Sequence, residues 1–234
     1  MTVQEIKVDC GDDTIVGALH LPTGSGLPCV IISHGLYGSK DSPKLTAVAE
    51  AFAAQGAAAL RYDHRGCGGS GGQIAHTTVA SRLEDLRTML EVATGHPLLG
   101  GSIGLLGSSM GGFISLFQAL RDPRVRALSL WSTPAFIRHP ERDAPPGTSL
   151  ERRAFLADAP HYDVRRVTRS AARCLILHGG ADDVVPPFHA RILHQSATDP
   201  KRLEILPGAD HKFSRPASRE RAIELSLEWC SAHL

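Results

Sequence analysis

The chain has 234 residues, of which 42% are hydrophobic and 21% are charged, and its formal net charge is +1. This composition is typical of a soluble globular domain, and the near-zero net charge gives no support for binding to nucleic acid or to a membrane surface. No apolar run reaches the ~18 residues of a membrane span, and the first residues lack the pattern of a signal peptide.

The number and spacing of the cysteines indicate whether the protein works in a reducing or an oxidising compartment. The five cysteines are widely spaced and form no CxxC pair: Cys10, Cys29, Cys67, Cys174 and Cys230. An odd number at such spacing favours reduced thiols over a disulfide framework or a zinc site. We therefore expect a cytoplasmic protein.

Apolar runs of strand length alternate with amphipathic segments along the chain. The runs that predict strands are residues 3–9, 14–21, 28–33, 57–62, 102–106, 125–131, 174–177 and 203–206. The segments that predict helices are 43–56, about 78–93, one that ends near residue 120, and the C-terminal residues. This alternation favours an α/β fold, with a mostly parallel sheet of about eight strands and helices on both faces.

The alternation is interrupted between residues 132 and 172. This stretch is rich in proline and charge and carries Pro134, Pro140, Pro145 and Pro146. A loop-rich insertion of this length inside a compact domain is usually either functional or disordered. We interpret residues 1–234 as one domain and residues 132–172 as a small cap over its site.

A candidate nucleophile follows the strand predicted at 102–106. Gly107-Ser108-Ser109-Met110-Gly111 fits the pattern G-x-S-x-G only when Ser109 is central, because Leu106 and Met110 would flank Ser108. The pattern needs small neighbours because the serine lies on a strained turn from strand to helix. The predicted strand and helix on either side favour Ser109 as the nucleophile.

A nucleophilic serine needs a base and an acid that orients the base. His211 lies in a loop just after the last predicted strand and is the candidate base. The loop after the strand at 174–177 carries two adjacent acids, Asp182 and Asp183, and either serves on proximity alone. The predicted chain order is therefore serine, aspartate, histidine.

The reaction also needs two backbone N–H groups that stabilise the developing oxyanion. One is expected from Met110, directly after the nucleophile. The other is expected from Leu36, since Gly35 lets the loop after the third strand turn inward. We interpret His34 as a brace for this loop rather than as a base.

Together these segments resemble the α/β-hydrolase superfamily, in particular small serine esterases of the cinnamoyl/feruloyl esterase, monoacylglycerol lipase and serine aminopeptidase grouping. The residues that carry the resemblance are His34–Leu36, Asp63–Ser70, Gly107–Gly111, His178–Pro186 and Asp210–His211. In such families the motif H-G-x-x-D-x-x-V-P has its acid at the fifth residue. The resemblance therefore implies Asp182 as the acid, and an antiparallel pair at the start of the sheet.

The segment Gly66–Gly71 also matches G-x-G-x-x-G, the pattern of a dinucleotide-binding loop. Such a loop opens a helix directly, whereas the next predicted helix begins only near Thr78. The segment fits the pattern D-x-x-G-x-G-x-S that the resemblance implies, in which the loop is structural and borders the site.

We therefore predict a carboxylesterase for small to medium acyl or aromatic esters, without cofactor or metal. The predicted substrate contacts are Tyr37, Phe136, Ile137 and Phe155. A thioesterase, an aminopeptidase with the same triad, and a non-hydrolytic ligand-binding member of the fold remain alternatives. The expected partner is a small-molecule ester, and the oligomeric state is left open, a homodimer included.

Overall fold

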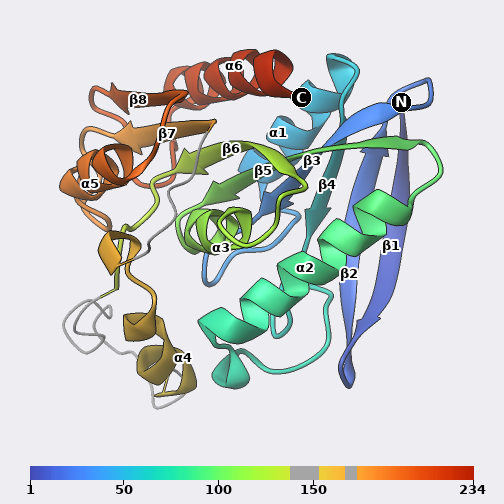
Figure 1. Ribbon diagram of the computed structural model, residues 1–234, viewed down its shortest axis with the longest axis horizontal. Helices are drawn as coiled ribbons and strands as arrows, with labels where there is room; N and C mark the ends of the chain where they lie inside the picture. The colour runs from blue at the N-terminus through green and yellow to red at the C-terminus, as the bar shows by residue number, and fades with distance from the viewer. Residues whose placement is uncertain (138–152, 167–172) are drawn as a thin grey trace.

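The computed structural model describes residues 1–137, 153–166 and 173–234. One eight-stranded sheet with the order β1-β2-β4-β3-β5-β6-β7-β8 runs through it (Figure 1). The strands are β1 (Thr2–Cys10), β2 (Asp13–Leu21), β3 (Leu27–Ser33), β4 (Ala58–Tyr62), β5 (Leu99–Ser108), β6 (Val125–Trp131), β7 (Cys174–Gly179) and β8 (Lys201–Leu206). The predicted α/β fold with a mostly parallel sheet of eight strands is confirmed.

Antiparallel pairing is confined to the start of the sheet. β2 runs antiparallel to both β1 and β4, and the remaining neighbours among the described strands pair in parallel. Cys10 pairs with Asp13, so Gly11 and Asp12 alone make the turn, and Gly11 has a φ of 61°. A glycine with positive φ at the first position of a two-residue turn matches the twist of a hairpin.

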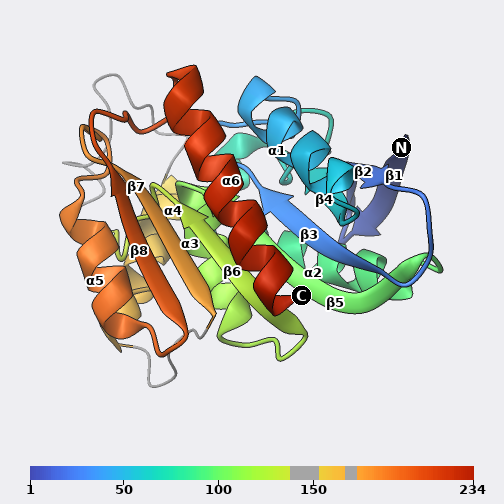
Figure 2. The ribbon, with the colours of Figure 1, turned by 90° about the horizontal axis from the view of Figure 1, so that it is seen from above.

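Helices cover both faces of the sheet (Figure 2). They are α1 (Pro43–Ala54), α2 (Val79–Gly95), α3 (Met110–Ala119), α4 (Arg153–Asp158), α5 (Phe188–Ser196) and α6 (Pro216–His233). Side chains of α1 and α6 form one buried apolar cluster with one face of the sheet, and α2, α3 and α5 contribute to the other. Burial on both faces explains why the central strands read as continuous apolar runs.

Local capping agrees with the helix ends that the sequence indicates. The Ser42 side chain accepts a hydrogen bond from the Leu45 N–H at the start of α1, and Gly56 just after its end has a φ of 84°. Thr78 and Ser81 form a reciprocal capping box at the start of α2. Such caps satisfy the free N–H groups of the first turn.

Helix α5 is an element that the sequence analysis did not predict. It has nine residues and buries only His189, Ala190 and Leu193, so its apolar stripe is short. Two prolines precede it, and histidines at 189 and 194 interrupt the apolar pattern. Its nine residues are fewer than the ~11–18 over which a helical period is read from a sequence.

The cap predicted for residues 132–172 is described in part. Residues 138–152 and 167–172 lie outside the described residues. The described part includes α4 and two short 3-10 turns, η3 (Ala159–His161) and η4 (Val164–Arg166). It is attached to the sheet-covering helices: the Asp158 carboxylate accepts from the Ala80 N–H at the start of α2 (2.9 Å), and Tyr162 packs edge-on against Phe117 of α3.

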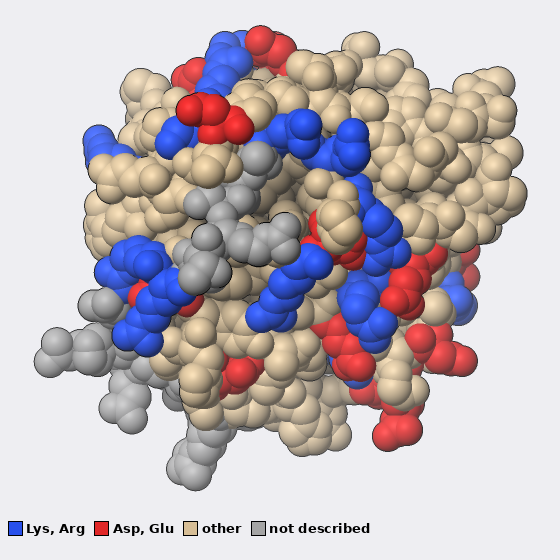
Figure 3. Space-filling model, viewed as in Figure 1, with Lys and Arg blue, Asp and Glu red and all other residues tan. Residues whose placement is uncertain are grey.

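Charges of both signs are mixed on the face shown in Figure 3, where Lys and Arg side chains lie beside Asp and Glu side chains. Ion pairs between charged side chains include Arg87 with Glu91 and Arg65 with Glu84. Within the part of the chain that the structure covers, no helix is both long enough and apolar enough to cross a membrane.

Candidate active site

Ser109 occupies a tight turn between β5 and α3. Its φ of 55° and ψ of −119° place a non-glycine residue in a strained backbone conformation. The turn closes only because its neighbours are small. A Cβ on Gly107 would lie 2.3 Å from the Gly111 carbonyl oxygen, and a Cβ on Gly111 would lie 2.1 Å from that of Ser33. The glycines of the G-x-S-x-G pattern are therefore sterically required.

His211 lies in the loop between β8 and α6 and reaches the turn from the far end of the chain. Its Nε2 lies 3.0 Å from Ser109 Oγ, although the two residues are 102 positions apart. Phe213 anchors this loop, since it is fully buried and packs against Trp131 of β6 at a ring separation of 5.3 Å. The Ala181 N–H also donates to the Ala209 carbonyl, which ties the His211 loop to the loop after β7.

Asp182 completes a chain of hydrogen-bonding groups that starts at Ser109 and passes through His211. Its carboxylate oxygens lie 3.0 and 2.8 Å from His211 Nδ1. One oxygen accepts from the backbone N–H groups of Val184 and Val185, and the other lies 3.3 Å from His178 Nε2. Burial acts to raise the pKa of Asp182, but the hydrogen bonds from His178, His211 and Val185 outweigh it and hold the pKa well below its usual range.

Of the two acids that proximity left open, only Asp182 meets His211. Asp182 is 5% exposed, whereas Asp183 is an exposed residue of the same loop. The structure thus brings together Ser109, His211 and Asp182 in the order that the sequence predicts. Ionised Asp182 accepts a hydrogen bond from the Nδ1–H of His211, which leaves the lone pair of Nε2 directed at Ser109 Oγ.

The loop after β3 lies directly against the Ser109 turn. A Cβ placed on Gly35 would be 3.6 Å from Ser109 Cβ, so this loop passes in van der Waals contact with Ser109. The Gly38 N–H donates to the Gly35 carbonyl (3.0 Å), which makes Leu36 and Tyr37 the central residues of a tight turn. The Leu36 N–H donates to no other described residue. Met110 is the first residue of α3, so its N–H has no acceptor within the helix.

His34 is held inside this loop and is 1% exposed. Its Nδ1 lies 2.6 Å from the Gly35 carbonyl oxygen, and its Nε2 accepts from the His64 N–H (3.0 Å). Burial, together with the nearby His64 and Arg82 side chains, lowers the pKa of His34 well below its usual value. A neutral, buried ring with both nitrogens engaged supports the interpretation of His34 as a brace.

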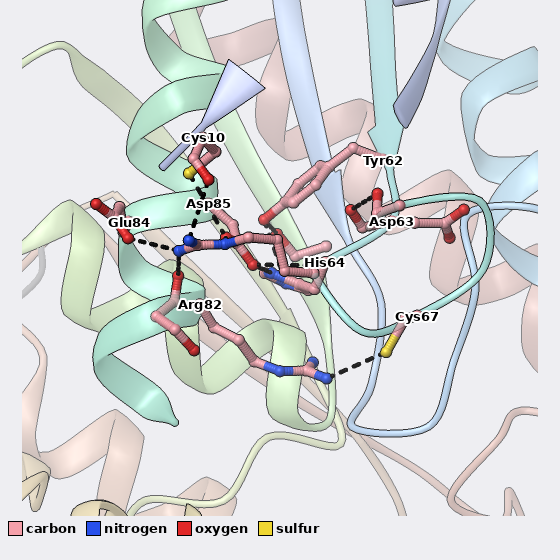
Figure 4. Close-up of polar contacts among 12 residues, drawn as sticks. Cys10, Tyr62, Asp63, His64, Cys67, Arg82, Glu84 and Asp85 are labelled. Atoms are coloured by element: carbon pink, nitrogen blue, oxygen red, sulfur yellow. Dashed lines mark hydrogen bonds and ion pairs between the residues drawn. The ribbon is translucent and has the colours of Figure 1, made fainter. Parts of the chain in front are cut away.

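A buried polar cluster connects this region to α2 (Figure 4). The Nδ1 atom of His64 lies 3.1 Å from the Asp85 carboxylate, and its Nε2 atom lies 3.2 Å from the Tyr62 hydroxyl. Arg65 pairs with Asp85 and Glu84. Burial lowers the pKa of His64 to about 4, so its imidazole is neutral at pH 7. These contacts hold the loop after β4 against the start of α2.

The sequence indicates no partner for Ser108, whereas the structure shows a hydrogen bond to it. Lys44 of α1 donates from Nζ to Ser108 Oγ (2.7 Å), and Ser108 is only 4% exposed. Ser108 therefore points away from His211 into the contact with α1. Burial lowers the pKa of Lys44 to about 8, partly offset by the charges of Asp210 and Asp182.

The four residues predicted to contact substrate have different surroundings. Tyr37 is 59% exposed on the turn beside Ser109. Phe136 is half-buried, with its ring 4.8 Å from that of His189 and the Arg165 guanidinium 3.9 Å above it. Ile137 is half-buried, and Phe155 is 5% exposed within the cluster formed with α2 and α3.

The glycine-rich loop at 66–71 wraps around a buried carboxylate. Asp63 accepts from the N–H groups of Lys40 (2.6 Å) and Gly69 (2.9 Å). A Cβ on Gly68 would lie 2.1 Å from this carboxylate. The loop leads into a 3-10 turn at Ile74–His76 rather than into a helix. This geometry supports a structural role for the loop.

Comparison with known proteins points to one family. Residues 27–172 match the family described as serine aminopeptidase, S33. An uncharacterized protein of Mycobacterium tuberculosis is 29% identical over 212 residues, which are 89% of this chain and 72% of that protein. A monoacylglycerol lipase of Mycolicibacterium smegmatis is 25% identical over 252 residues, with 88% of each chain covered. The solved structure of Est1E from Butyrivibrio proteoclasticus with bound ferulic acid has the same fold, with a TM-score of 0.77, 22% identity and coverage of 97% and 99%.

Proposed function

The chain belongs to the serine aminopeptidase S33 family of α/β hydrolases, and from this premise we propose that it is a carboxylesterase for small to medium acyl or aromatic esters. The observation that carries the proposal is the unbroken polar line from Ser109 Oγ through both nitrogens of His211 to the Asp182 carboxylate. Ser109 is the nucleophile, His211 the base and Asp182 the orienting acid.

The geometry supports a two-step acyl transfer. His211 Nε2 takes the proton of Ser109 as Oγ attacks the ester carbonyl, and the imidazolium then protonates the leaving alcohol. Water deacylates the enzyme by the reverse sequence. Asp182 keeps the proton on Nδ1 and stabilises the imidazolium, and its low pKa keeps it ionised throughout. These residues perform the chemistry without a cofactor.

Two backbone N–H groups are proposed to stabilise the oxyanion. Leu36 is the donor from the turn that touches Ser109, and Met110 is the donor at the start of α3. The positive end of the α3 dipole adds to the field at this point. Each donor of this kind contributes about 10²–10³ in rate.

Apolar side chains near the site favour an apolar acyl or aromatic group. Tyr37, Val184 and Phe188 are 59%, 64% and 47% exposed and lie on the loop after β3, the Asp182 loop and the start of α5. Half-buried Phe136 follows β6, with its ring centre 6.5 Å from that of Phe188. The similarity to a monoacylglycerol lipase also supports an ester substrate.

A paired substitution tests the proposal. Ser109→Ala is expected to lower kcat for p-nitrophenyl butyrate by about 10⁴–10⁶, as removal of a triad nucleophile does elsewhere. Ser108→Ala, whose hydroxyl faces Lys44, is expected to stay within ten-fold of the wild type. Hydrolysis that survives the change at Ser109 and is abolished at Ser108 would contradict the assignment.

A substrate panel separates the rival activities of the same triad. It contains p-nitrophenyl esters of two to eight acyl carbons, methyl ferulate, acyl-CoA thioesters and aminoacyl p-nitroanilides. The proposal expects the highest kcat/KM among the oxygen esters. A higher value for acyl-CoA identifies a thioesterase, and one for the anilides an aminopeptidase. A folded protein that turns over none of them but binds an ester analogue would be a ligand-binding member of the fold.

A further inference from the structure

Arg82 is a charged side chain without surface exposure, close to the candidate active site. It lies near the start of α2 and is 0% exposed. Figure 4 shows its side chain extended from α2 toward Cys67 in the loop after β4. Its Nη2 donates to the Leu36 carbonyl (2.7 Å) and lies 3.5 Å from Cys67 Sγ.

The contacts of Arg82 are unusual for a buried guanidinium. Among the described residues it forms no ion pair with a carboxylate, and its Nε and Nη1 make no hydrogen bond. Asp85, one helical turn further on, is instead engaged by His64 and Arg65. A buried charge of this kind costs stability, and an apolar side chain of the same volume would fill the space more favourably. Packing alone therefore gives no reason for an arginine at this position.

The carbonyl that Arg82 holds belongs to the turn that lies against the nucleophile. The Leu36–Tyr37 peptide is the central peptide of the turn closed by the Gly38 N–H and the Gly35 carbonyl. Its carbonyl oxygen is approached from two sides, by Arg82 Nη2 at 2.7 Å and by Cys67 Sγ at 3.7 Å. The Leu36 N–H belongs to the preceding Gly35–Leu36 peptide, whose carbonyl accepts from the Gly38 N–H. The hydrogen bonds from Gly38 and Arg82 therefore hold the two peptides that meet at the Leu36 Cα. The guanidinium thus limits how far this Cα, and the Leu36 N–H next to it, can move relative to Ser109.

We propose that Arg82 is a positioning residue of the oxyanion hole, which holds the Leu36 carbonyl so that the Leu36 N–H meets the developing oxyanion. This inference rests on the proposed esterase function. An oxyanion donor acts only within about 2.7–3.1 Å of the charge, and a displacement of about 1 Å can lower a rate by about 10². Arg82 touches neither substrate nor triad and acts through Leu36.

Arg82→Met tests the proposal, with Arg65→Met as the matched control. Both changes remove an arginine from the buried cluster between α2 and the β4 loop, but Arg65 contacts Asp85, Glu84 and backbone carbonyls of Cys10 and Ser81, not the Leu36 turn. Arg82→Met is expected to lower kcat for p-nitrophenyl butyrate by about 10- to 100-fold with KM within two-fold. Arg65→Met is expected to keep kcat within three-fold.

A transition-state analogue gives a readout that general loosening of the fold would not move. An aliphatic trifluoromethyl ketone forms a tetrahedral adduct whose oxyanion needs the same donors. Its affinity is expected to fall in Arg82→Met by the same factor as kcat, and Arg82→Lys is expected to restore part of both. If Arg82→Met does not fold, Arg82→Gln, which keeps a polar group in the buried place, carries the same expectation.

The outcomes separate this inference from the function on which it rests. Equal kcat and inhibitor affinity in the wild type and the neutral Arg82 variant would overturn the positioning role, as would equal losses in the Arg82 and Arg65 variants. If the folded wild type neither hydrolyses esters nor forms an adduct at Ser109 with a fluorophosphonate, the proposed function fails, and the positioning role fails with it.

Discussion

Asp182→Asn probes the orientation of His211 most sharply. One carboxylate oxygen of Asp182 accepts from the N–H groups of Val184 and Val185, so the oxygen of an introduced amide is held on that side. The amide nitrogen then replaces the oxygen that lies 2.8 Å from His211 Nδ1. A donor at this place makes Nδ1 an acceptor and moves the imidazole proton to Nε2, where it faces Ser109.

Loss of the lone pair on Nε2 removes the general base without removing a side chain. Where the tautomer is wrong, kcat falls by about 10⁴, which corresponds to about 5 kcal/mol of transition-state stabilisation. The assay is kcat for p-nitrophenyl butyrate at pH 7.5, with thermal unfolding as the check on folding. KM is expected to change little, because Asp182 does not contact substrate in the proposed mechanism.

Asp183→Asn is the matched control for this experiment. It makes the same chemical change one residue along, on an exposed side chain that the sequence alone did not distinguish from Asp182. Its kcat is expected to stay within two-fold of the wild type. The reasoning is refuted if Asp182→Asn retains more than a tenth of the wild-type kcat, or if both variants lose the same factor.

Two further predictions concern stability. Gly111→Ala places a Cβ 2.1 Å from the Ser33 carbonyl oxygen, so we expect a loss of about 1–3 kcal/mol and a lower Tm in calorimetry, whereas Gly95→Ala, which meets nothing within 4 Å, should change Tm little. The second prediction concerns Lys44, whose pKa of about 8 in the folded protein lies below the ~10.4 of lysine in an unfolded chain. Between these two pH values the lysine is protonated in the unfolded chain and mostly neutral in the folded one. The contribution of Lys44 to the free energy of unfolding therefore rises with pH over that range. Urea unfolding should show the wild type gaining stability relative to Lys44→Met by up to about 3 kcal/mol from pH 7.5 to 10.4; a constant difference, or a relative loss, would contradict the burial of the ammonium.

The sheet was predictable because its signals are local. Runs such as Cys29–Ile32 and Cys174–Leu177 are apolar throughout, as is typical of strands buried on both faces, and turns or caps separate them from the helices. The nine-residue helix α5 is shorter than the ~11–18 residues over which a helical period is read from a sequence. Local pattern thus decides the long elements and fails for a short one.

The candidate site shows the same division. Ser109, Asp182 and His211 were predictable as a set because each follows a strand of a parallel sheet, and the carboxyl ends of such strands meet at one edge. Arg82 and Lys44 carry no such signal. Their partners, Leu36 and Ser108, are 46 and 64 positions away, and the contacts depend on how α2 and α1 pack against the sheet. Such contacts follow from packing distances that sequence spacing does not contain.

The most direct test of the central claim is the position of a covalent adduct. The folded protein is treated with an alkyl fluorophosphonate, digested, and analysed by tandem mass spectrometry that resolves Ser108 from Ser109. The account predicts one adduct per chain, on Ser109, formed in parallel with the loss of esterase activity and absent from Ser109→Ala. An adduct on Ser108, or full inhibition of ester hydrolysis with Ser109 unmodified, would contradict it.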